Sequence, residues 1–162
     1  RGFLDAFEAL FDAMMREVVR LNRAALFTHD LNVLVFPEGT RSLKLARGFT
    51  GLMQMAQHVG VDIIPVGCNG SDKAYPTNSP FSKGGRIIYR IGPPLSLEGP
   101  ELQPYRVKSE YTPFTRDASE KHGPAFEAAT RVVMKHISEL IDPEYRAAGE
   151  VSTVHGVARF MQ

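Results

Sequence analysis

The sequence predicts an α/β protein with a mainly parallel sheet and helices on both faces. Short apolar runs rich in β-branched residues alternate with longer segments whose apolar residues recur every three or four positions. The short runs are apolar at nearly every position, which is typical of strands covered on both faces. Helix and strand follow one another along 162 residues, close to the length of a single domain.

Three segments are predicted as helices. Residues 3–21 form an amphipathic pattern with a mixed, not cationic, polar face, which favours core packing over membrane binding. Residues 51–60 form a second helix, with Gly60 as its C-terminal cap. The last helix is expected to begin near Pro124, because proline fits a first helical turn. The apolar positions expected inside are Phe3, Phe7, Leu10, Phe11, Met14, Val18, Leu21, Leu52, Met53, Met55, Ala56, Phe126, Ala129, Val132, Val133, Ile137, Leu140 and Ile141.

Three apolar runs are predicted as buried strands. They are "VLVF" at 33–36, "DIIPVG" at 62–67 and "RIIYRIG" at 86–92. Pro65 would remove one ladder hydrogen bond from the second strand. Residues 69–85 are rich in Gly, Pro, Asn and Ser and read as a loop, and residues 95–113 as irregular chain.

The first strand leads into a turn dense in polar chemistry, "PEGTRS". Ligands of open α/β sheets bind beyond the carboxyl ends of the strands. Gly39 allows a tight turn or the close approach of a ligand, and Arg41 offers a planar fork of donors suited to phosphate. Thr40 and Ser42 add hydroxyls. Glu38 is expected to hold the guanidinium or to accept a hydrogen bond from a substrate hydroxyl.

The same spacing also fits a plain surface turn. An exposed Glu–Arg pair there would contribute under about 1 kcal/mol. Lys44 and Arg47 add positive charge just downstream. From spacing alone, phosphate binding and a surface turn stay equally open.

Composition excludes several classes of function. The formal charge of +1 gives no basic excess of the kind that nucleic-acid binders carry. The single cysteine, Cys68, cannot form an internal disulfide and is expected to be a buried, unreactive residue of a protein in a reducing compartment. No metal-ligand cluster is apparent, so no metal site is predicted, and no apolar run approaches the roughly 20 residues of a membrane span.

Two stretches carry a family resemblance. "FPEGTRS" at 36–42 resembles the third sequence block of the glycerolipid acyltransferases, and "DIIPVG" at 62–67 resembles their fourth block. The resemblance implies a glycerolipid acyltransferase-like fold and transfer of a fatty acyl group from acyl-CoA or acyl-ACP to lysophosphatidic acid, without a cofactor or metal. It assigns binding of the glycerol phosphate to Glu38, Gly39, Thr40 and Arg41. Further candidates for ligand contact are Ser42, Lys44, Asp72 and Lys73.

The general base that the family carries is missing. The family pattern is a histidine and an aspartate with four residues between, and none of the five histidines here has aspartate five positions on. His58 and Asp62 are one residue too close, and His29 and Asp30 are adjacent. Residues 1–162 are therefore interpreted as the C-terminal part of a single acyltransferase domain, with the catalytic pair upstream of residue 1. Such a fragment is expected to be inactive alone.

The resemblance also implies partners and a location. The partners are a lysophospholipid acceptor, an acyl thioester donor on coenzyme A or acyl carrier protein, and a membrane surface for the full protein. The expected location is the cytoplasmic side of a membrane, with attachment through upstream sequence. Two alternatives remain: another acceptor, such as glycerol-3-phosphate or a different lysophospholipid, and a non-catalytic domain that binds phospholipid or protein.

Overall fold

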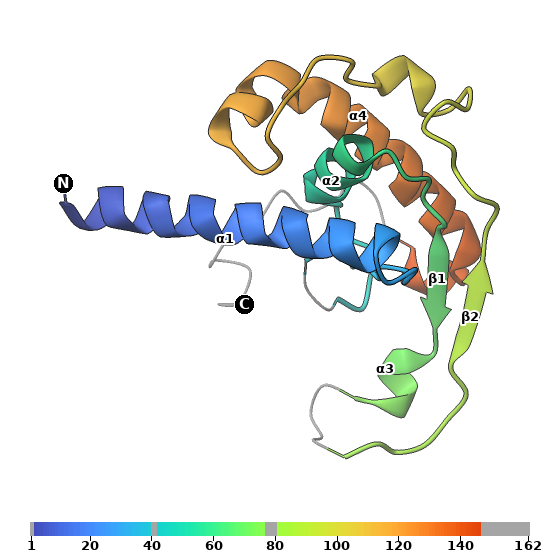
Figure 1. Ribbon diagram of the computed structural model, residues 1–162. Helices are drawn as coiled ribbons and strands as arrows, with labels where there is room; N and C mark the ends of the chain where they lie inside the picture. Colours follow the sequence, from blue (N-terminus) through green and yellow to red (C-terminus); the bar gives the residue numbers. More distant parts are fainter. Residues whose placement is uncertain (1, 40–41, 77–80, 147–162) are drawn as a thin grey trace.

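Long helices and a small sheet make up most of the regular structure. The computed structural model describes residues 2–39, 42–76 and 81–146. Its elements in chain order are the helices and strands α1 (Gly2–Phe27), α2 (Gly51–Val59), β1 (Val66–Asn69), α3 (Ser71–Ala74) and β2 (Ile88–Ile91), the 3-10 helix η1 (Gln103–Tyr105), α4 (Arg116–Leu140), and the 3-10 helix η2 (Pro143–Tyr145) (Figure 1).

The core lies between α2, α4 and the chain that follows β2. Met53 of α2 and Phe126 of α4 are fully buried, and Leu102 from the segment after β2 is 1% exposed. Met53 and Phe126 occupy inward positions that the helical spacing of the sequence predicted, whereas Leu102 was not predicted. Gly60 ends α2 in the left-handed region at φ 77°, and its amide donates to Ala56 O at 2.8 Å, so the predicted cap is confirmed.

Two buried glutamines fasten the chain between β2 and α4 to α2. Gln54 Oε1 accepts a hydrogen bond from the amide of Phe114 at 2.7 Å, and Gln57 Oε1 accepts one from the amide of Val107 at 2.8 Å. Backbone groups of a segment without its own ladder need such partners when they are covered. The glutamines thus give this segment the order that secondary structure gives elsewhere.

The sheet differs from the prediction. β1 and β2 form a two-stranded antiparallel sheet, with Gly67 opposite Arg90 and Cys68 opposite Tyr89. The predicted runs 62–67 and 86–92 do contribute to it, but antiparallel and small, because the described chain between them is a loop and a short helix and not a crossover helix. Ile63 adds one isolated antiparallel bridge to Leu95.

Within the described part of the chain, helices cover only one face of this sheet. α4 packs against the face that carries Gly67, so closely that an added Cβ on Gly67 would lie 2.7 Å from Leu140 atoms. On the other face Tyr89 is 64% exposed and Cys68 is also exposed. The expectation that Cys68 is buried was therefore wrong, because alternation along β1 turns it to the uncovered face.

Val33–Phe36 were predicted as a buried strand, and this is wrong. The described residues 31–36 have no regular secondary structure, and Leu34 and Phe36 are 75% and 74% exposed. A strand needs a neighbour to satisfy its backbone groups, and β1 and β2 pair with each other. The apolar run 33–36 therefore has no partner strand among the described residues.

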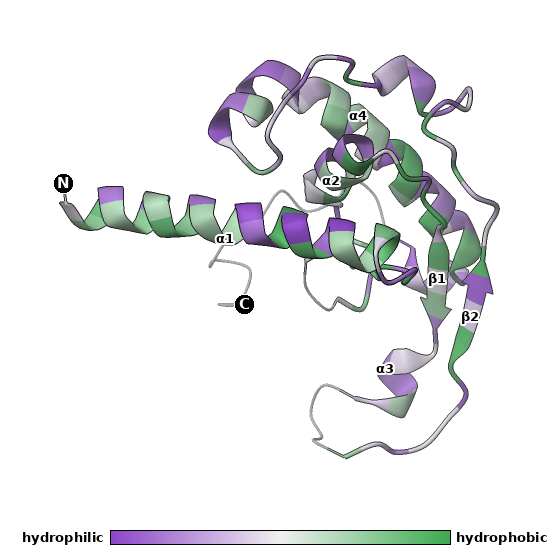
Figure 2. Ribbon diagram, in the orientation of Figure 1, coloured by the Kyte–Doolittle hydropathy of each residue, from purple (hydrophilic) through white to green (hydrophobic). Residues whose placement is uncertain are grey.

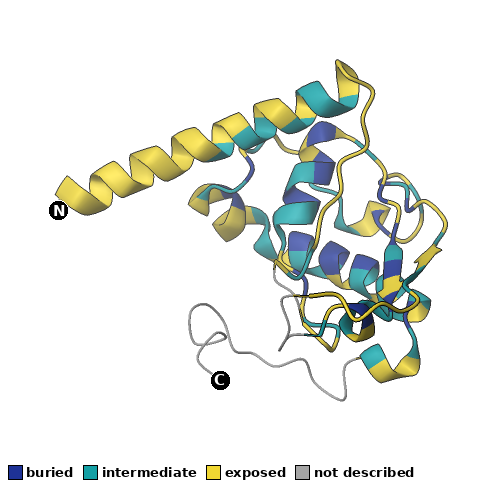
Figure 3. Cartoon of the chain, turned by 90° about the horizontal axis from the view of Figure 1, so that it is seen from below, coloured by how far each residue is buried: buried dark blue, intermediate teal, exposed yellow. Residues whose placement is uncertain are grey.

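Helix α1 forms as predicted, but it is not buried. It runs from Gly2 to Phe27 and holds no buried residue. Figure 3 shows its first half exposed on all sides, and Figure 1 shows it projecting from the rest of the molecule. Figure 2 shows green, apolar positions along this helix. Its residues Phe3 and Phe7 are 81% and 57% exposed. The expected core packing of this stripe was therefore wrong.

Helix α4 begins earlier than predicted. Its N-cap is Thr115, whose hydroxyl oxygen accepts a hydrogen bond from the amide of Ala118 at 3.2 Å, and Pro124 lies inside the helix. The first turns also carry the exposed ion pairs Arg116–Glu120 and Lys121–Asp117. The cap and these pairs favour helix ahead of a proline whose missing amide costs one helical hydrogen bond.

Candidate functional site

Glu38 organises the turn that follows Phe36. Its Oε1 lies 3.0 Å from Ser42 Oγ, and the same oxygen accepts a hydrogen bond from the amide of Ala46. Ser42 Oγ also lies 2.7 Å from Lys44 O. The carboxylate thereby holds the two ends of residues 38–46 together. Sequence reasoning assigned Glu38 to a ligand or a guanidinium and missed this bracing of its own turn.

Gly39 has the geometry that the sequence predicted. Its φ is +66°, and a Cβ there would lie 3.1 Å from the Phe49 ring. Phe49 is fixed in turn, because its amide donates to Pro37 O at 2.8 Å. Both the backbone angle and the space beside it therefore favour glycine. Thr40 and Arg41, the other two primary candidates, lie outside the described residues.

The two cationic residues after the turn contact distant parts of the chain. Lys44 Nζ donates to the carbonyl oxygen of Glu144 at 2.7 Å. Arg47 pairs with Glu127 of α4 at 3.1 Å, with both side chains nearly half exposed. An ammonium group has three donors, so Lys44 retains capacity for an anion, whereas Arg47 acts as a link between this segment and α4.

Asp72 and Lys73 of α3 are both engaged by η2. The hydroxyl of Tyr145 donates to Asp72 Oδ1 at 2.7 Å, which lowers the pKa of Asp72 and raises the pKa of Tyr145. Lys73 Nζ lies 2.7 Å from Glu144 Oε1, and this hydrogen-bonded pairing raises the pKa of Lys73. Both candidates sit on the surface with protein partners, which supports a structural role more directly than ligand contact.

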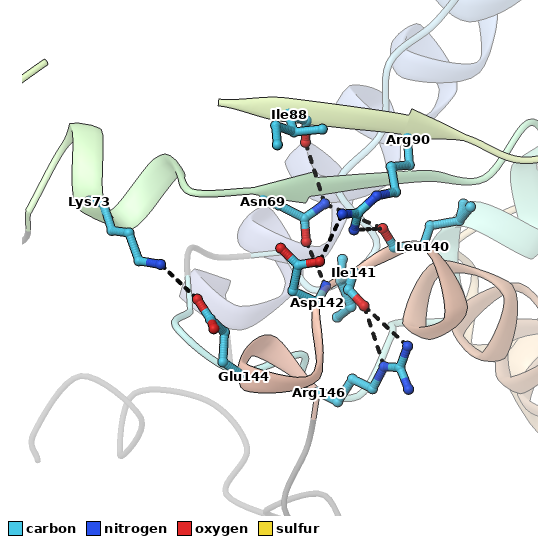
Figure 4. A network of polar contacts seen from close by, with 9 residues as sticks. All are labelled: Asn69, Lys73, Ile88, Arg90, Leu140, Ile141, Asp142, Glu144 and Arg146. Atoms are coloured by element: carbon cyan, nitrogen blue, oxygen red, sulfur yellow. Dashed lines mark hydrogen bonds and ion pairs between the residues drawn. The ribbon is translucent and has the colours of Figure 1, made fainter. Parts of the chain in front are cut away.

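Residues 140–146, called the 140–146 turn below, contact the sheet, and the sequence analysis did not predict this. Figure 4 shows how the turn meets β1 and β2. Asn69, 2% exposed, accepts a hydrogen bond from the amide of Asp142 at 2.6 Å through its Oδ1, and Arg90 pairs with Asp142 Oδ1 at 2.8 Å. The available sequence signal was a polar Asn ending an apolar strand, since a buried amide side chain needs partners.

His136 is not placed to act as a base beside the 38–46 turn. His136 Nε2 lies 2.7 Å from Glu101 Oε2, a histidine–carboxylate contact on α4. Each helical residue advances about 100°, so positions 127 and 136 face roughly opposite directions. Glu127 contacts Arg47, and His136 therefore faces away from the 38–46 turn.

A polar groove lies elsewhere on the molecule. Its lining includes His58, Arg106, Ser109 and Tyr111, and no predicted site residue that the structure describes belongs to it. Ser109 Oγ lies 3.2 Å from His122 Nε2 in an exposed contact. Within the described residues, no group of three or more His, Cys, Asp or Glu side chains is placed to hold a metal ion.

Comparison with known proteins adds the family. The family model described as Acyltransferase matches residues 11–69. Residues 11–69, about a third of the chain, are thus similar to this acyltransferase family. This acyltransferase segment includes most of α1, the 38–46 turn, α2 and β1, so both stretches that suggested the family lie inside it. Neither a curated protein nor a solved structure matches the chain significantly.

The family supports acyl transfer as the general activity of the protein. Among the described helices, none combines the length and apolar character needed to cross a bilayer. The acyltransferase segment ends at Asn69, so α4 and the 140–146 turn lie outside the match although they pack directly against it.

Proposed function

We propose that the protein transfers a fatty acyl group from acyl-CoA or acyl-ACP to lysophosphatidic acid (1-acylglycerol-3-phosphate) in phospholipid synthesis. The observation that carries the proposal is the family match, which spans the "FPEGTRS" turn at 36–42. In the sequence, a glycine with positive φ is followed directly by a threonine, an arginine and a serine. Such groups suit the phosphate of the acceptor.

The reaction joins the acceptor hydroxyl oxygen to the acyl carbon and breaks the thioester C–S bond. The proton of the hydroxyl passes to a general base, and the thiol of the donor leaves with a proton. In this proposal Arg41 and the backbone around Gly39 bind the acceptor phosphate. The base is a histidine–aspartate pair outside this sequence, and neither metal nor cofactor takes part. Because the acceptor resides in a bilayer, the full protein works at a membrane surface on its cytoplasmic side.

An acyl-CoA assay of the full-length protein tests the proposal. The acceptor panel contains lysophosphatidic acid, glycerol-3-phosphate, another lysophospholipid and a non-phosphorylated monoacylglycerol. We expect the highest kcat/KM with lysophosphatidic acid and negligible turnover of the monoacylglycerol. A preference for the non-phosphorylated acceptor would contradict the assigned substrate, and turnover by the 162 residues alone would contradict the assigned base.

Arg41→Ala is the variant that addresses the phosphate contact. A charge-assisted hydrogen bond contributes about 1.5–3 kcal/mol, so kcat/KM for the acceptor should fall roughly tenfold to a hundredfold. Arg131→Ala removes an exposed guanidinium of α4 and serves as the matched control. Unchanged acceptor kinetics in Arg41→Ala would leave Arg41 as a surface residue.

One observation favours a second candidate, a non-catalytic domain that binds phospholipid or protein. The sequence contains no histidine followed by aspartate at the family spacing. If the full-length protein binds glycerol-3-phosphate but turns over none of the four acceptors, the binding domain is the better assignment.

A further inference from the structure

The 140–146 turn contacts the second half of the 38–46 turn, the candidate acceptor turn. The amide of Leu45 donates to Tyr145 O at 2.8 Å, and Lys44 Nζ donates to Glu144 O at 2.7 Å. The two acceptors are the carbonyl oxygens of Glu144 and Tyr145, consecutive residues of η2 that lie about a hundred positions further along the sequence. Lys44 and Leu45 directly precede Ala46, whose amide donates a hydrogen bond to Glu38. The position of η2 therefore bears on the shape of the turn that Glu38 braces.

The side chains of the same two residues reach in another direction, to α3. Glu144 Oε1 lies 2.7 Å from Lys73 Nζ, and the hydroxyl of Tyr145 donates to Asp72 Oδ1 at 2.7 Å. Lys73 Nζ is also 5.9 Å from the centre of the Tyr145 ring. Backbone and side chain of η2 thus join two segments, 44–46 and 72–73, that follow the two family blocks.

The base of the turn is firmly held. Asn69 accepts the amide of Asp142 and also donates to Leu140 O at 3.3 Å, and Arg90 binds both Leu140 O and the carboxylate of Asp142 (Figure 4). Asn69 is 2% exposed, so its own contacts are shielded from water, whereas the side chains of Arg90 and Asp142 are 42% and 38% exposed. Because residues 140–142 are bound to β1 and β2, the position of η2 relative to Leu45 is defined.

We propose that Glu144 and Tyr145 are positioning residues for the acceptor site. Their side chains anchor η2 to α3, and their carbonyl oxygens then fix residues 44–46 and, through Glu38, the 38–46 turn. The inference rests on the proposed function, because it takes this turn as the place where the glycerol phosphate binds. Neither residue touches the acceptor in this assignment.

The contact of Lys73 with Glu144 is exposed and that of Tyr145 with Asp72 is only partly buried, so their effect lies in geometry more than in global stability. Lys73 and Glu144 side chains are 68% and 57% exposed, and such ion pairs add little to the free energy of unfolding. Loss of both anchors should free η2 locally while the core of α2 and α4 stays closed. Local opening of this kind is visible in amide hydrogen exchange.

The test uses the double variant Glu144→Ala/Tyr145→Phe in the full-length protein. We expect the Leu45 amide to exchange at least about tenfold faster, the factor that ~1.4 kcal/mol of local opening represents. Amides of α2 should keep their exchange rates. We also expect glycerol-3-phosphate, titrated by NMR, to bind at least about tenfold more weakly to the double variant than to wild type. Glu120→Gln breaks a comparable exposed ion pair on α4 and is the control.

The outcomes separate the two proposals. If wild type does not bind glycerol-3-phosphate, the acceptor assignment of the proposed function fails. If wild type binds it and the double variant binds equally well with unchanged Leu45 exchange, the positioning role alone is overturned. Faster exchange throughout α2 as well as at Leu45 would also overturn it, because that pattern indicates general destabilisation.

Discussion

At the scale of single residues, buried polar side chains hold irregular backbone in place through hydrogen bonds. Gln54 and Gln57 are 4% and 8% exposed and lie on the helix face that also carries Met53. Replacing either amide with an apolar group would leave the covered amides of Phe114 or Val107 without an acceptor. An unsatisfied buried donor costs about 1–3 kcal/mol, as much as losing a well-packed methylene or two.

Tyr111 provides a prediction on pH. Burial raises the pKa of its hydroxyl to about 12, and the hydroxyl donates to Gln54 O at 2.8 Å. A folded-state pKa raised above the ordinary value near 10 gives stabilisation that is complete below about pH 10 and is lost as the pH rises towards 12. Wild type should therefore exceed Tyr111→Phe in Tm at neutral pH by the equivalent of about 1 kcal/mol.

The Tm difference between wild type and Tyr111→Phe should shrink above about pH 10. Ultraviolet titration gives the second measurement, since the variant should lack a tyrosine transition near pH 12 that wild type shows. Identical titration curves for the two proteins would contradict the assigned burial of this hydroxyl.

Sequence reasoning succeeded where the cause of a residue's conformation is local. Gly39 and Gly60 were predicted from turn and cap chemistry, and both have positive φ. Asp72 and Lys73 were predicted as ligand contacts, but their partners Tyr145 and Glu144 lie more than 70 positions away. Periodicity and spacing carry no information about which distant turn meets a loop, so these contacts could not be predicted.

At the scale of elements, the close contact between β1 and the end of α4 governs the sheet. A Cβ on Gly67 would lie 2.7 Å from the carbonyl carbon, oxygen and Cβ of Leu140, most of which is backbone that cannot rotate away. Gly67→Ala should therefore lower the free energy of unfolding by about 1–3 kcal/mol, the usual cost of overpacking.

Chemical denaturation measures that change. Gly123→Ala is the matched control, because Gly123 lies within α4 with nothing within 4 Å of its added Cβ. Helix propensity predicts that the control gains up to about 1 kcal/mol. A Gly67→Ala protein as stable as wild type would show that α4 does not approach β1 this closely.

The strand predicted at residues 33–36 failed for a physical reason. A β-branched run such as 33–36 signals a segment suited to a sheet, but the ladder depends on a neighbour that local sequence does not supply. Helices depend on their own residues for hydrogen bonds, and α1, α2 and α4 were all found from periodicity, with α4 extended by its Thr115 cap. The antiparallel pairing of β1 with β2 required knowing that the chain between them returns without a crossover helix.

At the scale of the whole molecule, apolar surface is concentrated on α1. Phe3 and Phe7 are more than half exposed, and the first half of the helix makes no buried contact. Phe3→Ala/Phe7→Ala should leave Tm within the equivalent of about 0.5 kcal/mol, because no packing is lost. The double variant should also associate less than wild type, because exposed apolar patches favour association.

Sedimentation velocity over a range of concentrations, together with thermal unfolding, checks both expectations. Phe126→Ala is the contrasting control, since this fully buried ring should cost about 3–5 kcal/mol when removed. A large loss of Tm in the α1 variant would show that the stripe packs against the body.

Asn69 stands at a border between two ways of dividing the chain. The family match ends at Asn69, yet the side chain of Asn69 accepts a hydrogen bond from the amide of Asp142 in the 140–146 turn. The core cluster that contains Met53 also includes Phe126 of α4, outside the match. A fragment of residues 11–69 alone would leave the Asn69 side chain without its partners and expose the face of β1 that α4 covers. The segment that resembles the family is thus smaller than the folding unit.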